Sequence, residues 1–257
     1  MHTYLKKFIS FLLLSLLIGC ATGTNPNDPY ENFNRGVYQF NDTLDSVILK
    51  PVSTGYKTVA PDFAQKGVDN FFNNIRDFIT TVNDVLQFEF NNALNDGGRV
   101  ALNSTVGLLG FVDVHSMSGG ERRREDFGTT LASYGWKSSN YMVLPFLGPS
   151  TLRDGTGIAV DALLIDPLGY INDVRLRNQL MVLRIIDSRA SLLDASSILD
   201  EASLDPYAFQ RDAYLQHRNA MIDGEDKLIE YNEYLDFVDS EETPEDSISS
   251  ERVSSIN

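Results

Sequence analysis

Apolar side chains recur at helical spacing near the start of the chain, after a short polar stretch. Their intervals of four and three residues place them on one face of an amphipathic helix. Asp28 and Glu31 have the spacing of a capping pair and Pro29 suits the first helical turn, so we expect the helix to begin there. Lys50-Pro51 should end it, because proline disrupts a helix interior. The positions on the apolar face are Phe33, Val37, Phe40, Leu44 and Val47.

A second amphipathic helix is predicted over residues 67–86. Its apolar face is wider than that of the first helix, which indicates packing on more than one neighbour or contact with lipid. Ordinary core packing is the simpler interpretation, and both remain open at this point. The apolar positions are Val68, Phe71, Phe72, Ile75, Phe78, Ile79, Val82, Val85 and Leu86.

The middle of the chain, residues 97–157, contains most of its glycines. Two apolar segments, GLLGFVDV (107–114) and YMVLPFLGP (141–149), alternate there with turn residues. This composition predicts short helices and irregular connections, with room for one short hairpin.

Helical spacing returns in the last third of the chain. Apolar doublets recur between residues 185 and 199, and Asp205-Pro206 resembles a second helix start. A last amphipathic piece is expected over residues 224–238. Residues 239–257 are acidic and have almost nothing to bury, which predicts a disordered tail. The positions that follow Asp205-Pro206 at seven-residue spacing are Tyr207, Tyr214 and Met221.

Residues 1–19 have the composition of a secretory signal peptide. Two lysines precede the apolar run FISFLLLSLLI, which is too short to cross a bilayer of about 30 Å. The sequence LIGC that ends at Cys20 resembles a bacterial lipobox. The only cysteine of the chain is therefore the expected site of lipid attachment, with a thioether diacylglycerol and an N-acyl chain. Three acyl chains should hold the protein firmly, whereas a single chain binds a membrane only marginally.

These features divide the chain into a signal peptide (1–19), a lipidated N-terminus and tether (20–27), a helical domain (28–238) and an acidic tail (239–257). Beyond the signal peptide no apolar run reaches the roughly 18 residues that a transmembrane helix needs. The domain could therefore be soluble and merely tethered, or it could lie in the membrane interface.

The charge of the chain narrows the range of partners. The formal net charge is −15 at pH 7, and we expect no nucleic-acid binding, because phosphate contacts need lysine and arginine. The basic cluster at residues 122–124 could contact anionic lipid head groups or an acidic partner. We favour a solvated loop instead, in which Glu121, Glu125 and Asp126 balance the arginines.

Motifs of enzymes are absent from the sequence. It contains no G-x-S-x-G elbow, H-E-x-x-H motif, Walker loop or Rossmann glycine fingerprint. On a strand, Asp113 and His115 would share a face, with Ser116 and Ser118 nearby, and could suggest an acid–base pair. Residues this close in sequence rarely assemble a catalytic triad. We therefore predict that the protein is not an enzyme and uses no metal or cofactor.

A series of longer motifs resembles the MlaA family, also called VacJ lipoproteins. The series occurs in the family order and covers about residues 28–218. Because several motifs are long, the resemblance is specific. They are DPYENFNRGVYQFND (28–42), KPVSTGYKTVAP (50–61), GVDNFFNNI (67–75), LNSTVGLLGFVDV (102–114), EDFGTTLASYGW (125–136), YMVLPFLGPSTLRDGTG (141–157) and RDAYLQHR (211–218).

The resemblance implies a mainly α fold, in which amphipathic helices joined by Gly-rich loops form a ring around a central channel. It implies a lipoprotein on the periplasmic side of the outer membrane of a Gram-negative bacterium. Members remove mislocalised phospholipids from the outer leaflet and pass them to a soluble periplasmic carrier, MlaC, which maintains lipid asymmetry. Members commonly sit beside trimeric porins. The partners implied are thus phospholipids, porins and an MlaC-like carrier.

Lipid transfer needs a polar route past hydrocarbon rather than a nucleophile. We hypothesise that residues 28–49 and 67–86 build a membrane rim, and that residues 107–114 and 128–157 shape the channel and a gating segment. The candidate rim residues are Phe33, Val37, Phe40, Phe71, Phe72, Ile75 and Phe78. The candidate channel residues are Gly107, Gly110, Gly128, Tyr141, Pro145, Gly148 and Pro149.

Two other functions stay open at the level of sequence. The first is a tethered periplasmic scaffold that binds a partner and moves no lipid. The second is a lipid-modifying enzyme, such as a phospholipase that uses His115.

Overall fold

The computed structural model describes Asn25, residues 28–196 and residues 203–223. Several predictions lie outside these described residues, namely Cys20 with the signal peptide, the helix expected at 224–238 and the acidic tail. The chain divides into two compact units, residues 1–215 and residues 216–257. Of the second unit, the structure describes only the end of one helix, residues 216–223.

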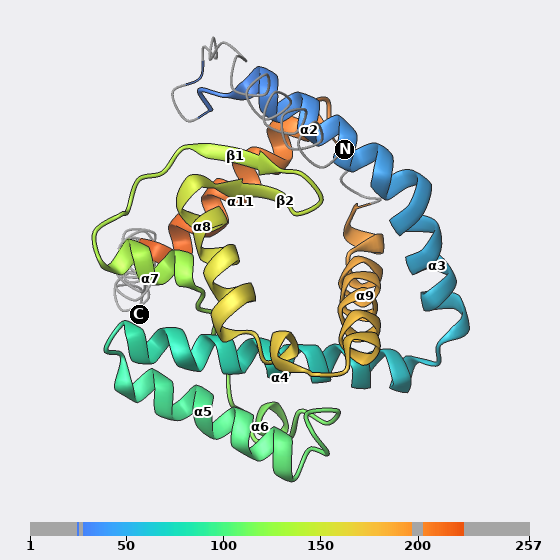
Figure 1. Ribbon diagram of the computed structural model, residues 1–257, viewed down its shortest axis with the longest axis vertical. Coiled ribbons are helices and arrows are strands. Elements are labelled where there is room, and N and C mark those ends of the chain that lie inside the picture. The colour runs from blue at the N-terminus through green and yellow to red at the C-terminus, as the bar shows by residue number, and fades with distance from the viewer. Residues whose placement is uncertain (1–24, 26–27, 197–202, 224–257) are drawn as a thin grey trace, which may run out of the picture. The chain divides into compact units, whose positions relative to one another are not determined.

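The described residues are mainly helical, which confirms the predicted fold class (Figure 1). The first half comprises α2 (Glu31–Leu44), the π-helical turn η1 (Asp45–Leu49), α3 (Lys50–Val59), α4 (Asp62–Leu86), α5 (Phe90–Thr105) and α6 (Val114–Met117). The second half comprises α7 (Phe127–Ser133), β1 (Tyr141–Leu144), β2 (Gly148–Thr151), α8 (Leu152–Val160), η2 (Asp161–Ile165), η3 (Pro167–Tyr170), α9 (Val174–Ser191) and α11 (Pro206–Asp223).

The first helical segment continues through Pro51, so the expected stop at Lys50-Pro51 is wrong. The π-helical turn η1 lets Lys50 donate its backbone N–H to Asp45, five residues back. Pro51 then falls in the first turn of α3, where a missing N–H costs no hydrogen bond. The helical path therefore runs to Val59, with a change of hydrogen-bond register instead of a break.

The expected capping box at the start of α2 is also wrong. Tyr30 occupies the N-cap position, and no side chain caps this end of the helix. Asp28 is instead completely buried, and its carboxylate accepts a hydrogen bond from the Asn34 amide at 2.8 Å. Its buried carboxylate therefore makes tertiary contacts with segments that are distant in the sequence, and it does not cap the helix.

The helix α4 ends at Leu86 as predicted but begins earlier, at Asp62. Pro61 precedes it in an extended conformation, which suits the residue before a helix. The following helix α5 packs alongside α4 (Figure 1).

The Gly-rich middle contains short helices and one antiparallel hairpin, as expected. Strands β1 and β2 pair with Tyr141 opposite Thr151 and Leu144 opposite Gly148. The helices α7 and α8 approach so closely that a Cβ added at Gly157 would lie 2.4 Å from the backbone nitrogen of Gly128. Glycine at this contact allows the two helix backbones to touch.

Within the unit of residues 1–215, contacts between elements can be followed from α2 back to α2 (Figure 1). The hairpin contacts α2 on one side and α8 on the other. The helix α8 continues through η2 to α4, α4 contacts α9, and α9 contacts α3. The helix α3 then returns to α2 through η1.

A small apolar cluster links the hairpin to α2 and α11. Its buried members are Tyr141, Val143 and Tyr207, and Val37 and Tyr38 pack against them. No helix among the described residues combines the length and apolarity needed to cross a membrane.

Candidate functional site

The described part of the chain buries mainly polar side chains and exposes apolar ones. Buried polar and charged residues outnumber buried apolar residues, and Arg99 and Arg153 are the largest of the fully buried side chains. Phenylalanine, leucine and valine side chains are exposed on nearly every helix. Monomeric soluble proteins rarely expose large apolar patches, and such patches mark sites of contact with protein or membrane.

The helix α4 shows the inversion most clearly. Its buried positions are almost all polar and repeat at helical spacing, whereas Phe78, Val85 and Leu86 face outward and are exposed. Residues three and four positions apart lie on one helix face. The polar residues therefore form the inner face of α4, and they are Asn73, Asn74, Asp77, Thr80, Asn83 and Asp84.

Polar contacts hold the successive elements together. Asn34 on α2 accepts a hydrogen bond from the backbone N–H of Val143 on β1 at 2.9 Å. Asn83 on α4 donates to Asp161 on η2 at 3.2 Å, and Thr130 on α7 donates to Asn83 at 2.8 Å. Buried polar groups need such partners, because an unpaired one costs about 1–3 kcal/mol.

The contacts of α9 follow the same rule. Tyr56 on α3 donates to Asp187 at 3.0 Å, and the Arg189 guanidinium binds Asp45 through two nitrogens at 2.6 and 2.7 Å. Burial raises the pKa of Asp187, although the Tyr56 hydroxyl opposes that shift. The sequence analysis singled out none of these polar residues.

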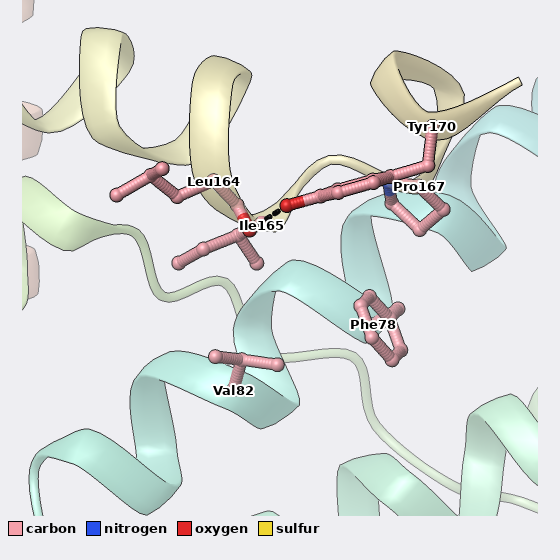
Figure 2. A pocket seen from close by; sticks show the side chains of 6 residues that line it. All are labelled: Phe78, Val82, Leu164, Ile165, Pro167 and Tyr170. Atoms are coloured by element: carbon pink, nitrogen blue, oxygen red, sulfur yellow. Dashed lines mark hydrogen bonds between the residues drawn. The ribbon is translucent and has the colours of Figure 1, made fainter.

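An apolar pocket opens between α4 and the η2–η3 segment (Figure 2). Its cavity volume is about 340 Å³, at the lower end of the roughly 300–1,000 Å³ that is usual for ligand pockets. Tyr170 donates its hydroxyl to the Leu164 carbonyl at 2.8 Å, which satisfies the one polar group on the pocket wall (Figure 2). The lining residues are Phe78, Val82, Leu164, Ile165, Pro167 and Tyr170.

Every non-glycine residue with a positive φ angle in the described part of the chain is a large, exposed apolar residue. Such a backbone conformation costs about 1–3 kcal/mol per residue. In water, these exposed apolar side chains would make no favourable contact that offsets the cost of the backbone conformation. These residues are Phe88, Leu108, Leu109 and Phe146.

Four candidate channel residues lie in the turns that contain these positive φ angles: Gly107, Gly110, Pro145 and Gly148. Gly110 has φ +91°, and a Cβ there would clash with Asn74 at 2.7 Å. A Cβ at Gly107 would meet the Val112 carbonyl oxygen at 2.2 Å. Gly148, with φ +87°, follows Pro145 at the hairpin turn. Pro149 lies in β2.

Two candidate channel residues are packed between elements, and their place in a channel stays a prediction. Tyr141 is fully buried in the apolar cluster, where its ring packs against Tyr207. Gly128 is buried against Gly157. Both residues fix contacts between elements because those contacts lie inside the fold.

The candidate rim residues are divided in a similar way. Phe33, Phe40 and Phe78 are exposed, by 37%, 48% and 39% of their surface. The candidates Val37, Phe71 and Ile75 are half-buried. Phe72 is buried, with 1% exposure. Its neighbour Phe71 stacks on Phe111 of the strained turn at a centroid distance of 5.4 Å.

The basic cluster at residues 122–124 is balanced mainly by acids that are distant in sequence. Arg122 pairs with Asp77 at 3.1 Å and with Asp113 at 2.9 Å. Arg123 pairs with Glu89 and with its neighbour Glu125. Of the three acids proposed as counter-charges, Glu125 pairs with Arg123 at 3.5 Å.

Asp113 and His115 do not form an acid–base pair. Asp113 caps α6 and is surrounded by donors, among them Ser116, Asn103 and the buried Arg99. Burial would raise the pKa of Asp113, but these hydrogen bonds and the charge of Arg122 together hold it below its ordinary value. The imidazole of His115 packs against Gly120. The arrangement positions a loop and shows no general base.

Residues that could bind a metal ion do not cluster in the described part of the chain: no group of three or more histidine, cysteine, aspartate or glutamate side chains is placed to hold one.

Comparison with known proteins identifies relatives over most of the chain. The family model described as MlaA lipoprotein matches residues 26–221. The intermembrane phospholipid transport system lipoprotein MlaA of Escherichia coli strain K12 is 35% identical over 230 residues, which cover 86% of this chain and 90% of the relative. An uncharacterized protein of Rickettsia typhi is 35% identical over 195 residues, covering 76% of this chain and 78% of the relative.

A solved structure has the same fold. It was described under the heading of a structural basis for maintenance of bacterial outer membrane lipid asymmetry. The TM-score is 0.66 and the sequence identity is 33%, over 76% of this chain and 98% of the other.

Proposed function

The chain belongs to the MlaA lipoprotein family, and from this premise we propose that it is an outer-membrane lipoprotein for phospholipid transport. It removes mislocalised phospholipids from the outer leaflet of the outer membrane and passes them to a periplasmic carrier. The relative from Escherichia coli is named for intermembrane phospholipid transport, and the solved relative for outer membrane lipid asymmetry. Both names support this function.

The observation that carries the proposal is the inverted distribution of side chains. Polar residues line the contacts inside the unit, and exposed apolar residues cover its helices. A protein that lies in the hydrophobic layer of a membrane places its residues in this way. The cost of the strained turns at Phe88, Leu108, Leu109 and Phe146 is offset when their side chains enter lipid.

The attachment of the protein follows from the same reasoning. We propose that acyl chains on Cys20 anchor it to the periplasmic side of the outer membrane. Cys20 lies eight residues before Asp28, and a fully extended chain spans at most about 3.6 Å per residue. The tether therefore keeps Asp28, just before α2, within about 30 Å of the anchored acyl chains.

A central channel is part of the proposal. Contacts that lead from α2 through the hairpin, α8, α4, α9 and α3 back to α2 support a ring. Their polar character supports a hydrated passage, which lowers the cost of moving a charged head group past hydrocarbon. We propose a trimeric porin as the neighbour in the membrane and an MlaC-like protein as the acceptor. No cofactor takes part in this transfer.

The proposal is tested by labelling outer-leaflet phospholipid in a deletion strain. The deletion should accumulate phospholipid at the cell surface, and the wild-type gene should reverse this. A Cys20→Ala version should fail to reverse it although the protein is made. A strain with unchanged surface phospholipid would favour the tethered scaffold. Release of lysolipid or fatty acid that depends on His115 would favour an enzyme.

Membrane embedding has its own test. Phe78→Glu places a charge on the exposed face of α4, and we expect it to weaken binding of the purified protein to detergent micelles and lipid vesicles. Asn172→Glu, at an exposed polar position, is the matched control. Equal binding of both variants would count against an embedded α4.

A further inference from the structure

Three arginines from distant segments come together between α4, α9 and the loop before α7. Arg76 on α4 donates to the Ser188 hydroxyl on α9 at 3.2 Å, and Ser188 lies one turn beyond Arg184. Arg124, in the loop before α7, donates to Asn73 at 3.2 Å, and Asn73 lies one turn before Arg76. Helical geometry therefore makes the three guanidinium groups neighbours.

The arginine cluster, Arg76, Arg124 and Arg184, lies among aspartates that balance part of its positive charge, since Arg184 pairs with Asp166 at 2.6 Å and Asp69 and Asp187 act on Arg76. The hydrogen-bond partners of Arg76 and Arg124 in the described residues are neutral. Burial lowers the pKa of Arg76, and the charges of Arg124 and Arg184 lower it further, while Asp69 and Asp187 oppose the shift. Arg76 and Arg184 are half-buried and Arg124 is exposed, whereas the fully buried Arg99 and Arg153 are paired with carboxylates.

The cluster adjoins the apolar pocket through Asp166. Arg184 donates to the Asp166 carboxylate at 2.6 Å. Asp166 lies between Ile165 and Pro167, which line the pocket (Figure 2). A cationic site and an apolar cavity are thus adjacent, within an acidic protein.

We propose that this arrangement is a phospholipid-binding subsite, in which the arginine cluster holds the phosphodiester and the pocket takes part of an acyl chain. The proposal rests on the proposed function and identifies a site at which the transported lipid binds on its way through the protein. Guanidinium groups bind phosphate through paired hydrogen bonds, and the contact is strongest where water is excluded. A bound phosphate also relieves the repulsion among the three arginines.

Binding of short-chain lipids to the purified, acylated protein in detergent tests the subsite. The probes are dihexanoyl phosphatidylglycerol, the matching neutral diacylglycerol and inorganic phosphate, each measured by calorimetric titration. Arg76→Gln with Arg124→Gln should weaken binding of the phospholipid by about tenfold or more. The same double variant should leave the weaker binding of the diacylglycerol unchanged. Val82→Trp, which fills the pocket, should weaken binding of both lipids.

Two further variants keep the result interpretable. Arg175→Gln removes an exposed arginine of α9 outside the cluster and should bind all probes as the wild type does. Arg76→Lys with Arg124→Lys keeps the charges but loses the paired hydrogen bonds, and should lose less affinity than the glutamine pair. Melting temperatures close to that of the wild type would show that each variant is folded.

The outcomes separate this subsite from the general function. Equal phospholipid affinity of the wild type and the double glutamine variant would overturn the subsite, and so would inorganic phosphate that binds as tightly as the phospholipid. Surface phospholipid in the complemented deletion strain is measured in parallel. If the wild-type gene restores asymmetry while the binding prediction fails, only the subsite is wrong. If the wild-type gene restores nothing, the proposed function itself is wrong.

Discussion

Asp28 and Asp84 are both completely buried, yet their surroundings differ. The Asp28 carboxylate accepts hydrogen bonds from the Asn34 amide and the Tyr207 hydroxyl, and it pairs with Arg211 at 3.5 Å. No amide, hydroxyl or guanidinium group among the described residues hydrogen-bonds to the Asp84 carboxylate. Its neighbour is another buried acid, Asp96, and the two carboxyls can share a hydrogen bond only when one of them holds a proton.

The difference teaches how the polar interior tolerates charge. At Asp28, donors from α2 and α11 replace the water that the carboxylate lost, so it can join these segments. At Asp84, burial and the neighbouring Asp96 together raise the pKa of the carboxyl to about 7. One region stabilises the fold through a network of hydrogen bonds, and the other favours the neutral form of a buried acid.

The largest expected effect comes from removing Asp28. Asp28→Ala leaves the Tyr207 hydroxyl and the Arg211 charge without their buried acceptor. Breaking a buried pair in this way costs about 3–5 kcal/mol. Chemical unfolding in detergent measures the loss, and Asp28→Asn, which keeps one acceptor, should lose less. A loss below about 1 kcal/mol for Asp28→Ala would contradict the network.

An intermediate effect is expected at the other end of the same network. Tyr207→Phe removes one donor but keeps the ring that packs on Tyr38 and Tyr141. We expect unfolding to become easier by about 1–3 kcal/mol, because Asp28 loses a charge-assisted hydrogen bond. Tyr170→Phe, whose hydroxyl is exposed, is the control and should change stability less.

A smaller effect is expected from pH, and it should come from the α4 acids. The folded pKa of Asp84 is about 7 and that of Asp77 is about 6, both raised first by burial. Unfolded aspartate titrates near 3.9. The folded state therefore binds more protons between these values, so this contribution is complete below about pH 4 and is lost as the pH rises to about 7. Unfolding titrations from pH 4 to 8 measure the slope.

The smallest effect is expected from Asp84→Asn. The amide cannot ionise, so its presence near neutral pH should change stability by less than about 1 kcal/mol. The same variant should flatten the fall in stability between pH 4 and 7. If it instead destabilises the protein as strongly as Asp28→Ala does, Asp84 has an essential partner and the contrast between the two sites fails.

Sequence reasoning identified the family and the fold class, because both depend on local patterns. The end of α4 and the start of α11 at Asp205-Pro206 were likewise local signals. The strong amphipathic pattern of α4 also showed two distinct faces. It could not show which face is buried, since a repeat of polar residues has the same period as a repeat of apolar ones.

The rest depended on contacts between distant residues. Asp28 looked like a helix cap because its partners, Tyr207 and Arg211, lie 179 and 183 residues further along the chain. The arginine cluster could not be predicted from the sequence either, because its members come from three separate segments. Phe72 lies in the same helical repeat as exposed apolar residues of α4. Only its packing against other elements buries it, and the sequence does not show that packing.

The outward apolar surface has a consequence for biogenesis. On the route that the proposed function implies, the folded chain would cross an aqueous compartment with an apolar exterior that water disfavours. Such a molecule would self-associate if its surface were unshielded. The proposed function therefore implies an escort that shields these side chains, and overproduction beyond the capacity of that escort should yield aggregates.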